Sequence, residues 1–370
     1  MIHACHAGCD FSRHWLDLSS LSPLAIPVAA PVAAGRFAND AAGRQALLRR
    51  LTEAGPNQSG PNQSGPDQSG PDQSGVALLV IEASGGTEQG LLIAAWAAGQ
   101  KVALVPAQRV RHFARSLEQQ ARTDRIDAHV LALYAARTGP ASTPATGENH
   151  RRLRTLVARR RILVGMRADE RKRGLHCGTD SVARSITALD TCLSAEIKTI
   201  EAAIRAAIQT CRDSAARAAR RLGMPGIGPA TAATLLAELP ELGQVSQGQV
   251  SQGQVSQGQV SQGQVSQGHV SQGQVTSGQI AALAGLATFT RQSGQWRSKS
   301  WISGGRKPVR DALYMAATTC VFRTQSRFAT FYKSLRARGK PHKRALIATM
   351  RKMLTTLNAM LRNDQNFTPA

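Results

Sequence analysis

The sequence predicts an α/β domain over residues 1–138, a helical connector over 149–221 and a mostly helical domain over 222–370. Three observations predict this order. Apolar runs of strand length alternate with amphipathic runs of helix length in the first region. A long arginine-rich stretch with helical spacing follows, and after it a Pro-Gly-Ile-Gly turn introduces further helical patterns. A chain of 370 residues is long enough for domains with separate cores.

In the first domain, strand and helix patterns follow one another closely. Asp17 lies between two leucines in a short strand pattern, and Asp10 comes just before that pattern. Further strands are predicted at 76–83 and 101–105. The predicted helices are 41–51, 88–99 and 124–137. Strands that alternate with helices are typical of an α/β domain.

The connector begins with residues 150–173, which carry ten Lys or Arg against two acids. Leucines and valines recur there at helical spacing, so the segment is predicted to be an amphipathic helix with a cationic outer face. Residues 181–221 are predicted to form a second long helical stretch. A charge run is usually a solvated face, but an excess of one sign this large favours contact with nucleic acid.

The C-terminal domain opens with RLGMPGIGPATAATLLAEL at 221–239. A glycine turn followed by an alanine-rich helix is typical of the helix-hairpin-helix module, in which amides at Gly226 and Gly228 would meet a DNA phosphate. The alternative is a tight helix-helix turn without a ligand. Residues 341–361 carry a stripe of leucines and methionines, which we interpret as core or as an oligomer contact.

The charge of the chain indicates its partner. Lys+Arg number 46 against 23 Asp+Glu, a net charge of +23, which favours binding to a polyanion through counterion release. No run of about 18 uncharged apolar residues is present, which argues against a membrane-spanning protein. The first residues lack the pattern of a signal peptide. We therefore expect a cytoplasmic protein that works on nucleic acid.

Cysteine usage agrees with a reducing compartment. The six cysteines show no paired spacing, so free thiols are expected rather than disulfide bonds. His3, Cys5, His6 and Cys9 are close enough to suggest zinc, but ligands so crowded, without a second cluster downstream, rarely complete a tetrahedron. We interpret them as the lead-in to a strand.

Two blocks of pentapeptide repeats interrupt these patterns. PNQSG and PDQSG copies fill 56–75, and QVSQG copies dominate 244–278. Their composition cannot bury a core, so both blocks are predicted to be flexible inserted loops. A tolerated repeat expansion explains them better than a polar binding arm does. Without the blocks, the element patterns on each side are continuous.

Four acidic residues stand out because acids are scarce in this chain. Glu82 ends an apolar strand pattern, Asp10 precedes another, and Asp124 and Asp127 lie three apart near the start of a predicted helix. Four carboxylates that converge on one site need a divalent cation, and oxygen ligands suit Mg²⁺ or Mn²⁺. Such ions can activate a nucleophile and stabilise a leaving oxygen. Taken singly, Asp124 fits a helix cap and Asp127 fits an ion pair with Arg125.

Several motifs together resemble one family. They are, in chain order, GCDFSRHWLDL, FANDAAGRQALL, VIEASGG, TDRIDAHVLA, ALVARRRILVGMRADERKR, PGIGPATAATLLAELPELG, IAALAGLATFTRQSGQWR, ISGGRKPVRDALYMAA and LRARGKPHKRALIATMRKML. This series is similar to the DEDD transposases of insertion-sequence family one hundred and ten. The resemblance covers nearly the whole chain apart from the two repeat blocks and a divergent stretch at 19–35.

The resemblance implies a RuvC-like, ribonuclease-H-type N-terminal domain whose acids are Asp10, Glu82, Asp124 and Asp127. It also implies a coiled-coil connector and a C-terminal transposase domain whose nucleophile is Ser293. In the family this serine attacks a DNA phosphate and holds the strand as a phosphoserine while partners exchange. A structured non-coding RNA that pairs with target and donor DNA is implied as well, and we expect a homo-oligomer, a dimer or tetramer.

The surroundings of Ser293 fit a phosphate, although the residues alone do not select this serine. Three basic residues lie near it in sequence: Arg291, Arg297 and Lys299. Three other serines share that setting: Ser298, Ser300 and Ser303. The glycine-rich loop ISGGRKPVR, with Arg306 and Lys307, is a second candidate phosphate cradle at the start of a helix. The family resemblance is what selects Ser293.

Two alternatives to a recombinase are open. A metal-dependent Holliday-junction-type nuclease would use the four acids alone, with water as the nucleophile. An inactive relic would bind nucleic acid without chemistry, since the repeats and a weakly apolar segment before Asp10 depart from the family pattern. A covalent protein–DNA adduct distinguishes the recombinase from the nuclease, and strand exchange distinguishes it from the relic.

Overall fold

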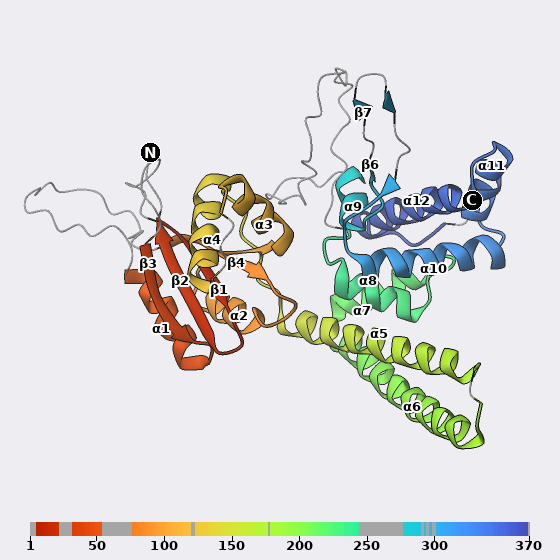
Figure 1. Ribbon diagram of the computed structural model, residues 1–370. Coiled ribbons are helices and arrows are strands. Elements are labelled where there is room, and N and C mark those ends of the chain that lie inside the picture. Colours follow the sequence, from red (N-terminus) through yellow and green to blue (C-terminus); the bar gives the residue numbers. More distant parts are fainter. Residues whose placement is uncertain are drawn as a thin grey trace, which may run out of the picture. The chain divides into compact units, whose positions relative to one another are not determined.

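The computed structural model describes residues 5–21, 32–53, 76–119, 123–176, 178–243, 277–289, 292–293, 296–297 and 301–368. Two compact units make up the chain, Met1–Ala145 and Thr146–Ala370 (Figure 1). The repeat block 56–75 and nearly all of the block 244–278 lie outside the described residues. The last two residues assigned to the second block instead begin a helix.

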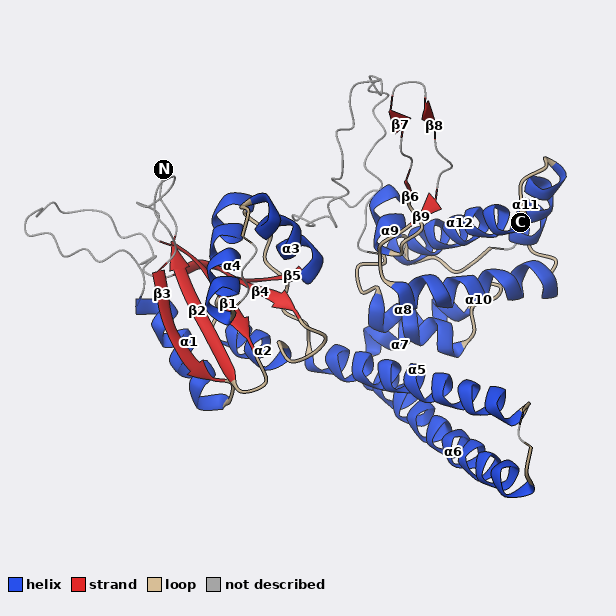
Figure 2. Ribbon diagram, in the orientation of Figure 1, coloured by secondary structure: helices blue, strands red, loops and turns tan. Residues whose placement is uncertain are grey.

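Unit 1 (Met1–Ala145) is built on a mixed five-stranded sheet (Figure 2). Its strands are β1 (Cys5–Phe11), β2 (Trp15–Leu21), β3 (Val32–Ala38), β4 (Val76–Ala83) and β5 (Val102–Pro106). They lie in the order β3-β2-β1-β4-β5. β2 is antiparallel to both β1 and β3, and β4 and β5 run parallel to β1. This order and these directions are those of a ribonuclease-H-like domain.

Helices cover both faces of the sheet. They are α1 (Ala41–Glu53), α2 (Gln89–Ala97), α3 (Ala107–Ser116) and α4 (Asp124–Thr138). The first two pack against side chains such as Cys9 and Ile81 on one face. The other two pack against Val80 and Val105 on the opposite face. A strand covered on both faces needs apolar residues on both, which explains the nearly unbroken apolar run of β4.

A glycine in β1 sets the distance between the sheet and α4. A Cβ atom at Gly8 would lie 2.3 Å from the backbone nitrogen of Ala132 and 2.4 Å from the carbonyl oxygen of Ala128. Glycine is the one residue type without a Cβ atom, so it lets α4 approach β1 this closely. Asp10, two residues further on, faces the same helix because side chains alternate along a strand.

Unit 2 (Thr146–Ala370) is mostly helical. Its helices are α5 (Glu148–Gly174), α6 (Asp180–Thr210), α7 (Arg212–Leu222), α8 (Pro229–Glu238), α9 (Ser277–Leu283), α10 (Lys307–Arg323), α11 (Arg327–Ala337) and α12 (His342–Arg362). α5 and α6 pack along each other through Leu163, Leu193 and Ile197. The stripe predicted in the last helix is buried in the core of this unit, for example at Met353 and Leu357. Of the two interpretations of that stripe, core is the one that the structure bears out.

Two short strand pairs lie between α9 and α10. β6 (Thr288–Phe289) pairs with β9 (Trp301–Ile302), and β7 (Gln292–Ser293) pairs with β8 (Trp296–Arg297). Both pairs are antiparallel. They form around the segment that carries the predicted serine, where the sequence analysis predicted no strand.

Several elements differ from the sequence prediction. Asp10 lies inside β1 and not before a strand, because CHAGCDF forms a core strand although Phe11 is its only large apolar side chain. β3, α3, α9 and α11 were not predicted. The stretch 181–221 is two helices, since the backbone at Cys211 is extended. None of the helices in the described parts of the chain combines the length and apolar character that crossing a membrane requires.

Candidate active site

Charged residues form a row across the sheet of unit 1, on the face that α4 covers. Asp10 of β1 is paired with Asp17 of β2, and Asp17 with Arg36 of β3. The parallel register of β1 with β4 makes Glu82 the neighbour of Asp10 on its other side. Residues opposite each other on adjacent strands project to the same face. The sheet therefore presents three acids and one arginine side by side.

Helix α4 adds two more acids to this face. Asp124 and Asp127 lie in its first turn. The N-cap is Thr123, whose hydroxyl accepts a hydrogen bond from the backbone N–H of Ile126 at 3.3 Å. The alternative role of Asp124 as the helix cap is therefore wrong. The helix dipole and the free amides of the first turn favour negative charge here.

The four predicted acids share one electrostatic neighbourhood, as the pKa of Asp10 shows. The pKa of Asp10 is raised to about 7, and burial is the largest cause. A hydrogen bond from the backbone N–H of Phe11 lowers it, and the charges of Asp127, Asp124 and Glu82 contribute to the rise. A carboxyl group with a pKa near neutrality is typical of functional sites. Among the described residues, however, no three His, Cys, Asp or Glu side chains are arranged so that they could hold a metal ion.

An arginine neutralises part of the charge beside these acids. The guanidinium of Arg36 donates to both carboxylate oxygens of buried Asp17, with Nε–Oδ1 and Nη2–Oδ2 distances of 2.9 Å. Its Nη2 atom also lies 3.5 Å from a carboxylate oxygen of Asp124. The sequence analysis missed both Arg36 and Asp17 as site residues. Asp17 carries the signal that was used for Glu82, an acid within an apolar strand.

The cysteines of β1 lie on the opposite face. Cys5 and Cys9 belong to the core under α1 and α2, and both are free. Burial, and then the charges of Asp10 and Asp17, raise the pKa of the Cys9 thiol well above its usual value. A buried neutral thiol is a poor metal ligand. These cysteines are core residues and not zinc ligands, and His3 lies outside the described residues.

The predicted nucleophile is in unit 2. Ser293 and Arg297 lie on the paired strands β7 and β8. Arg291 and Lys299 lie outside the described residues. The acids and the serine belong to different units, so the role of Ser293 stays a prediction.

The two glycines of the predicted hairpin differ in their surroundings. Gly226 has a φ of +85°, and a Cβ atom there would lie 2.3 Å from the carbonyl oxygen of Ala316 in α10. Close helix packing and a left-handed backbone therefore explain the glycine. Gly228 is exposed and is the N-cap of α8, with open space around it. Of the two, Gly228 is the one that a phosphate could approach.

The basic residues of unit 2 are partly neutralised within the unit. Arg306 donates from Nη1 and Nη2 to the carboxylate of Glu241, at 2.7 and 2.6 Å. Lys307 is exposed and is paired with Asp311. Acids of α6 or α8 pair with four arginines of α5: Arg154, Arg160, Arg161 and Arg171. The cationic face predicted for α5 is thus smaller than the sequence indicates.

Comparisons with known proteins match two parts of the chain. Residues 28–177 match the DEDD-type transposase family of IS110 elements, and residues 268–333 match the transposase family of IS116, IS110 and IS902. The first match includes three of the predicted acids but begins after Asp10. The second match includes Ser293.

Two curated relatives span most of the chain. The pilin gene-inverting protein of Moraxella lacunata is 28% identical over 301 residues, which cover 78% of this chain and 81% of that protein. The protein of the same name from Moraxella bovis matches with the same identity and coverage. An uncharacterized 43.6 kDa protein of insertion element IS110 from Streptomyces coelicolor is 34% identical over 85 residues, 23% of this chain and 21% of that protein. With transposase families matched in both units, the chain belongs to the IS110 family of transposases, DNA recombinases that carry out phosphoryl transfer.

Proposed function

We propose that the protein cleaves and rejoins DNA strands through two chemical centres. One is a carboxylate cluster of Asp10, Glu82, Asp124 and Asp127 that binds Mg²⁺ or Mn²⁺, and the other is the hydroxyl of Ser293. The proposal rests on one observation. Helix α4 packs on the face of the ribonuclease-H-like sheet at the point where β1 and β4 lie side by side. There, each of the other three acids raises the pKa of Asp10.

The donor atoms of the cluster suit a divalent cation, although in the described structure the carboxylates are not arranged to hold one. All of the donors are carboxylate oxygens, which Mg²⁺ and Mn²⁺ prefer to thiols. The pKa of Asp10 is raised to about 7 mainly by burial, and the charges of the other three acids contribute to the rise. The DEDD type of the family also implies the use of divalent metal. When bound, the metal supplies charge neutralisation at the reacting phosphate.

Other residues of unit 1 hold the acids in position. Thr123 fixes the first turn of α4, and Arg36 holds Asp17 and Asp124 at the same time. Gly8 permits the close approach of α4 to β1. These contacts position the acids near one another, and the carboxylates would have to shift from the described arrangement to hold a metal ion together.

At the second centre we propose a transesterification. The oxygen of Ser293 attacks a DNA phosphorus, a serine–phosphate bond forms, and the bond to a DNA oxygen breaks. The serine loses its proton, and the leaving DNA oxygen gains one. The phosphoserine keeps the phosphoester bond, so a hydroxyl of another strand can reverse the step and rejoin the DNA. The name of the Moraxella relatives, pilin gene-inverting protein, suits a recombinase that rejoins the strands it cuts.

The proposal has four finer features. The α5–α6 pair acts as a coiled coil, and the turn before α8 acts as a helix-hairpin-helix that meets a DNA phosphate at Gly228. A structured non-coding RNA guides the protein, for which the family resemblance is the support. A homo-oligomer, a dimer or tetramer, follows from the chemistry, because exchange between duplexes breaks several strands and each break occupies one serine.

A search for a covalent adduct tests the proposal. Wild-type protein incubated with labelled element-end DNA and Mg²⁺ is expected to keep the label after denaturation, and Ser293→Ala is expected to lose it. Matched controls that should keep at least some adduct are Ser298→Ala, Ser300→Ala and Ser303→Ala. Cleavage without any adduct would support a nuclease that uses water, and an adduct in Ser293→Ala would assign the nucleophile to another serine. Neither cleavage nor strand exchange would indicate a relic.

A further inference from the structure

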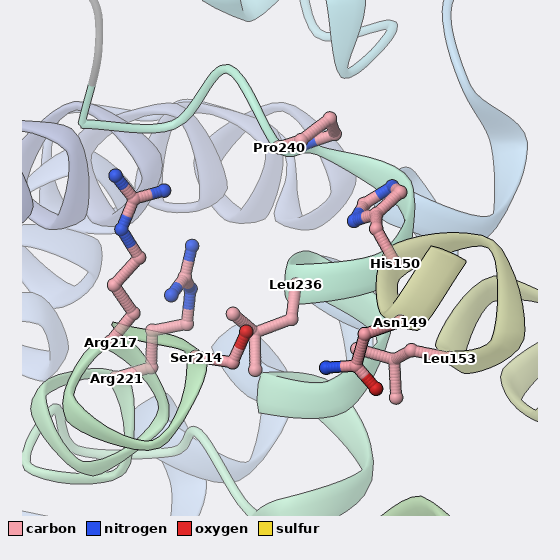
Figure 3. A pocket seen from close by; sticks show the side chains of 8 residues that line it. All are labelled: Asn149, His150, Leu153, Ser214, Arg217, Arg221, Leu236 and Pro240. Carbon is pink, nitrogen blue, oxygen red and sulfur yellow. The ribbon is translucent and has the colours of Figure 1, made fainter. Parts of the chain in front are cut away.

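Unit 2 contains a cavity with a buried arginine that has no counter-ion among the described residues. The cavity has a volume of about 290 Å³ and is formed where α5, α7 and α8 meet. Arg221, near the end of α7, is 0% exposed, and its Nε and Nη1 atoms have no hydrogen-bond partner in the described structure. Its side chain lines the cavity (Figure 3). Charged side chains this deeply buried are normally paired, so the arrangement calls for an anion.

The other lining groups also suit an anion. Arg217, one turn before Arg221, projects from α7 beside it, as Figure 3 shows. Across the cavity lie Asn149 and His150, which belong to the first turn of α5. That turn has no side-chain cap, and its amides carry the positive end of a long helix dipole. Ser214 adds a hydroxyl group.

No acid among the cavity-lining residues neutralises this charge. The nearest acids of α8 and of the loop after it are used elsewhere, since Glu238 pairs with Arg154 and Arg161, and Glu241 pairs with Arg306. The pKa of Arg221 is lowered to about 9. Burial is the larger cause, and the charge of Arg217 contributes. The arginine therefore remains charged at neutral pH, and burying this unpaired charge costs free energy of folding.

We propose that this cavity is a phosphate-binding site, in which Arg221 and Arg217 hold one backbone phosphate of the DNA that the transposase binds. Each planar guanidinium group can donate to two oxygens of a phosphate, and two guanidinium groups together offer more donors than a single carboxylate can accept. The site also lies next to the α7–α8 turn, for which contact with DNA is proposed. The inference rests on DNA binding by the family and not on the role of Ser293.

Thermal melting of the full-length protein in inorganic phosphate, compared with chloride at equal ionic strength, provides the first test. Phosphate is expected to raise the melting temperature of wild type but not that of Arg221→Met. Without phosphate, Arg221→Met should melt at the same temperature as wild type or higher, because it removes an unpaired buried charge. The matched control is Arg220→Met, since Arg220 is the adjacent arginine of α7 and is paired with Asp364 instead. An equal response to phosphate in Arg221→Met would overturn the proposal.

A salt series with duplex DNA distinguishes a backbone phosphate from a free anion. Arg221→Met is expected to weaken DNA binding roughly 10-fold and to reduce the slope of log Kd against log salt by about 1. If phosphate stabilises wild type through Arg221 but the DNA affinity of Arg221→Met is unchanged, the site binds a free anion and the proposal is wrong. Should Arg221→Met fail to fold, Arg217→Met provides the same comparison at a partly exposed position. The phosphate response should persist in Ser293→Ala, so failure here and failure of the serine mechanism can be told apart.

Discussion

In unit 1 partly buried and exposed acids gather beside the core, whereas in unit 2 a fully buried arginine carries positive charge. Asp10 sits among three other acids, and these surroundings raise its pKa to about 7. Arg221 sits beside another arginine, and its surroundings lower its pKa to about 9. Both shifts work against the charged form of the group, so each unit is suited to a ligand of the opposite charge. For unit 1 that ligand is a divalent cation, and for unit 2 it is a phosphate.

The comparison also shows how differently the two charges are supported. In unit 1 a matched cation is already present at the edge of the cluster, because Arg36 bridges Asp17 and Asp124. In unit 2 the described residues offer Arg221 no such partner. The acids of unit 1 are partly compensated, whereas Arg221 in unit 2 is not. Binding of an anion to unit 2 should therefore change stability more than binding of a cation to unit 1.

The largest effect is expected from removal of one acid of the cluster. Glu82→Gln or Asp124→Asn should reduce strand cleavage at least about 1000-fold, because each removes a ligand for the metal. DNA binding should change little, since the basic surface remains. Asp40→Asn is a matched control, because Asp40 is an exposed acid that accepts a hydrogen bond from the Gly43 amide, which Asn can also do. Full cleavage by either cluster variant would contradict the assignment.

A smaller but still large effect is expected at Gly8. Gly8→Ala puts a Cβ atom against the backbone of α4 and should destabilise unit 1 by about 3 kcal/mol. Urea unfolding followed by circular dichroism measures this. The control is Gly165→Ala in α5, where a Cβ atom meets nothing within 4 Å and helix propensity should stabilise the protein by about 1 kcal/mol. Equal stability of the two variants would show that α4 does not depend on this contact.

The fold could be predicted from the sequence wherever one segment carries its own pattern. β4 and α4 have apolar runs or stripes of the right period, and their predicted bounds agree with the structure to within a residue. β1 could not be predicted in this way, because Gly8 in it is explained by contact with α4, which is distant in sequence. β3 was missed for a related reason, since it is exposed along much of its length and lacks a buried face of its own.

The candidate site was predictable in part for the same reason. Acids at the end of an apolar strand or the start of a helix are visible locally, as with Glu82 and Asp124. The pairing of Asp17 with Arg36 depends on the register of β2 with β3, which no local pattern fixes. Arg221 is buried by packing among three helices, and in the sequence it is only one basic residue among many.

The smallest of the expected effects on stability concerns Asp10 and is read from its pH dependence in the presence of a chelator. The pKa of Asp10 is about 7 in the folded protein against an ordinary value of 3.8, so between these values the folded state holds a proton that the unfolded state has lost. The stability of wild type therefore falls as the pH rises from about 4 to about 7, and it stays reduced above that. Asn at this position cannot ionise.

Asp10→Asn should consequently match wild type at pH 4 and be more stable than wild type at pH 8. The rise of the Asp10 pKa from 3.8 to about 7 would correspond to about 4 kcal/mol, and partial exposure to solvent reduces this to about 2 kcal/mol. Mg²⁺ should narrow the difference in stability at pH 8. A cation near the ionised Asp10 stabilises wild type, whereas in the variant the cation has one fewer carboxylate to bind. Chemical unfolding at the two pH values, with and without Mg²⁺, measures all four states. If Asp10→Asn is less stable than wild type at pH 8 in chelator, the acids of unit 1 are already compensated within the protein, and the contrast with Arg221 in unit 2 fails.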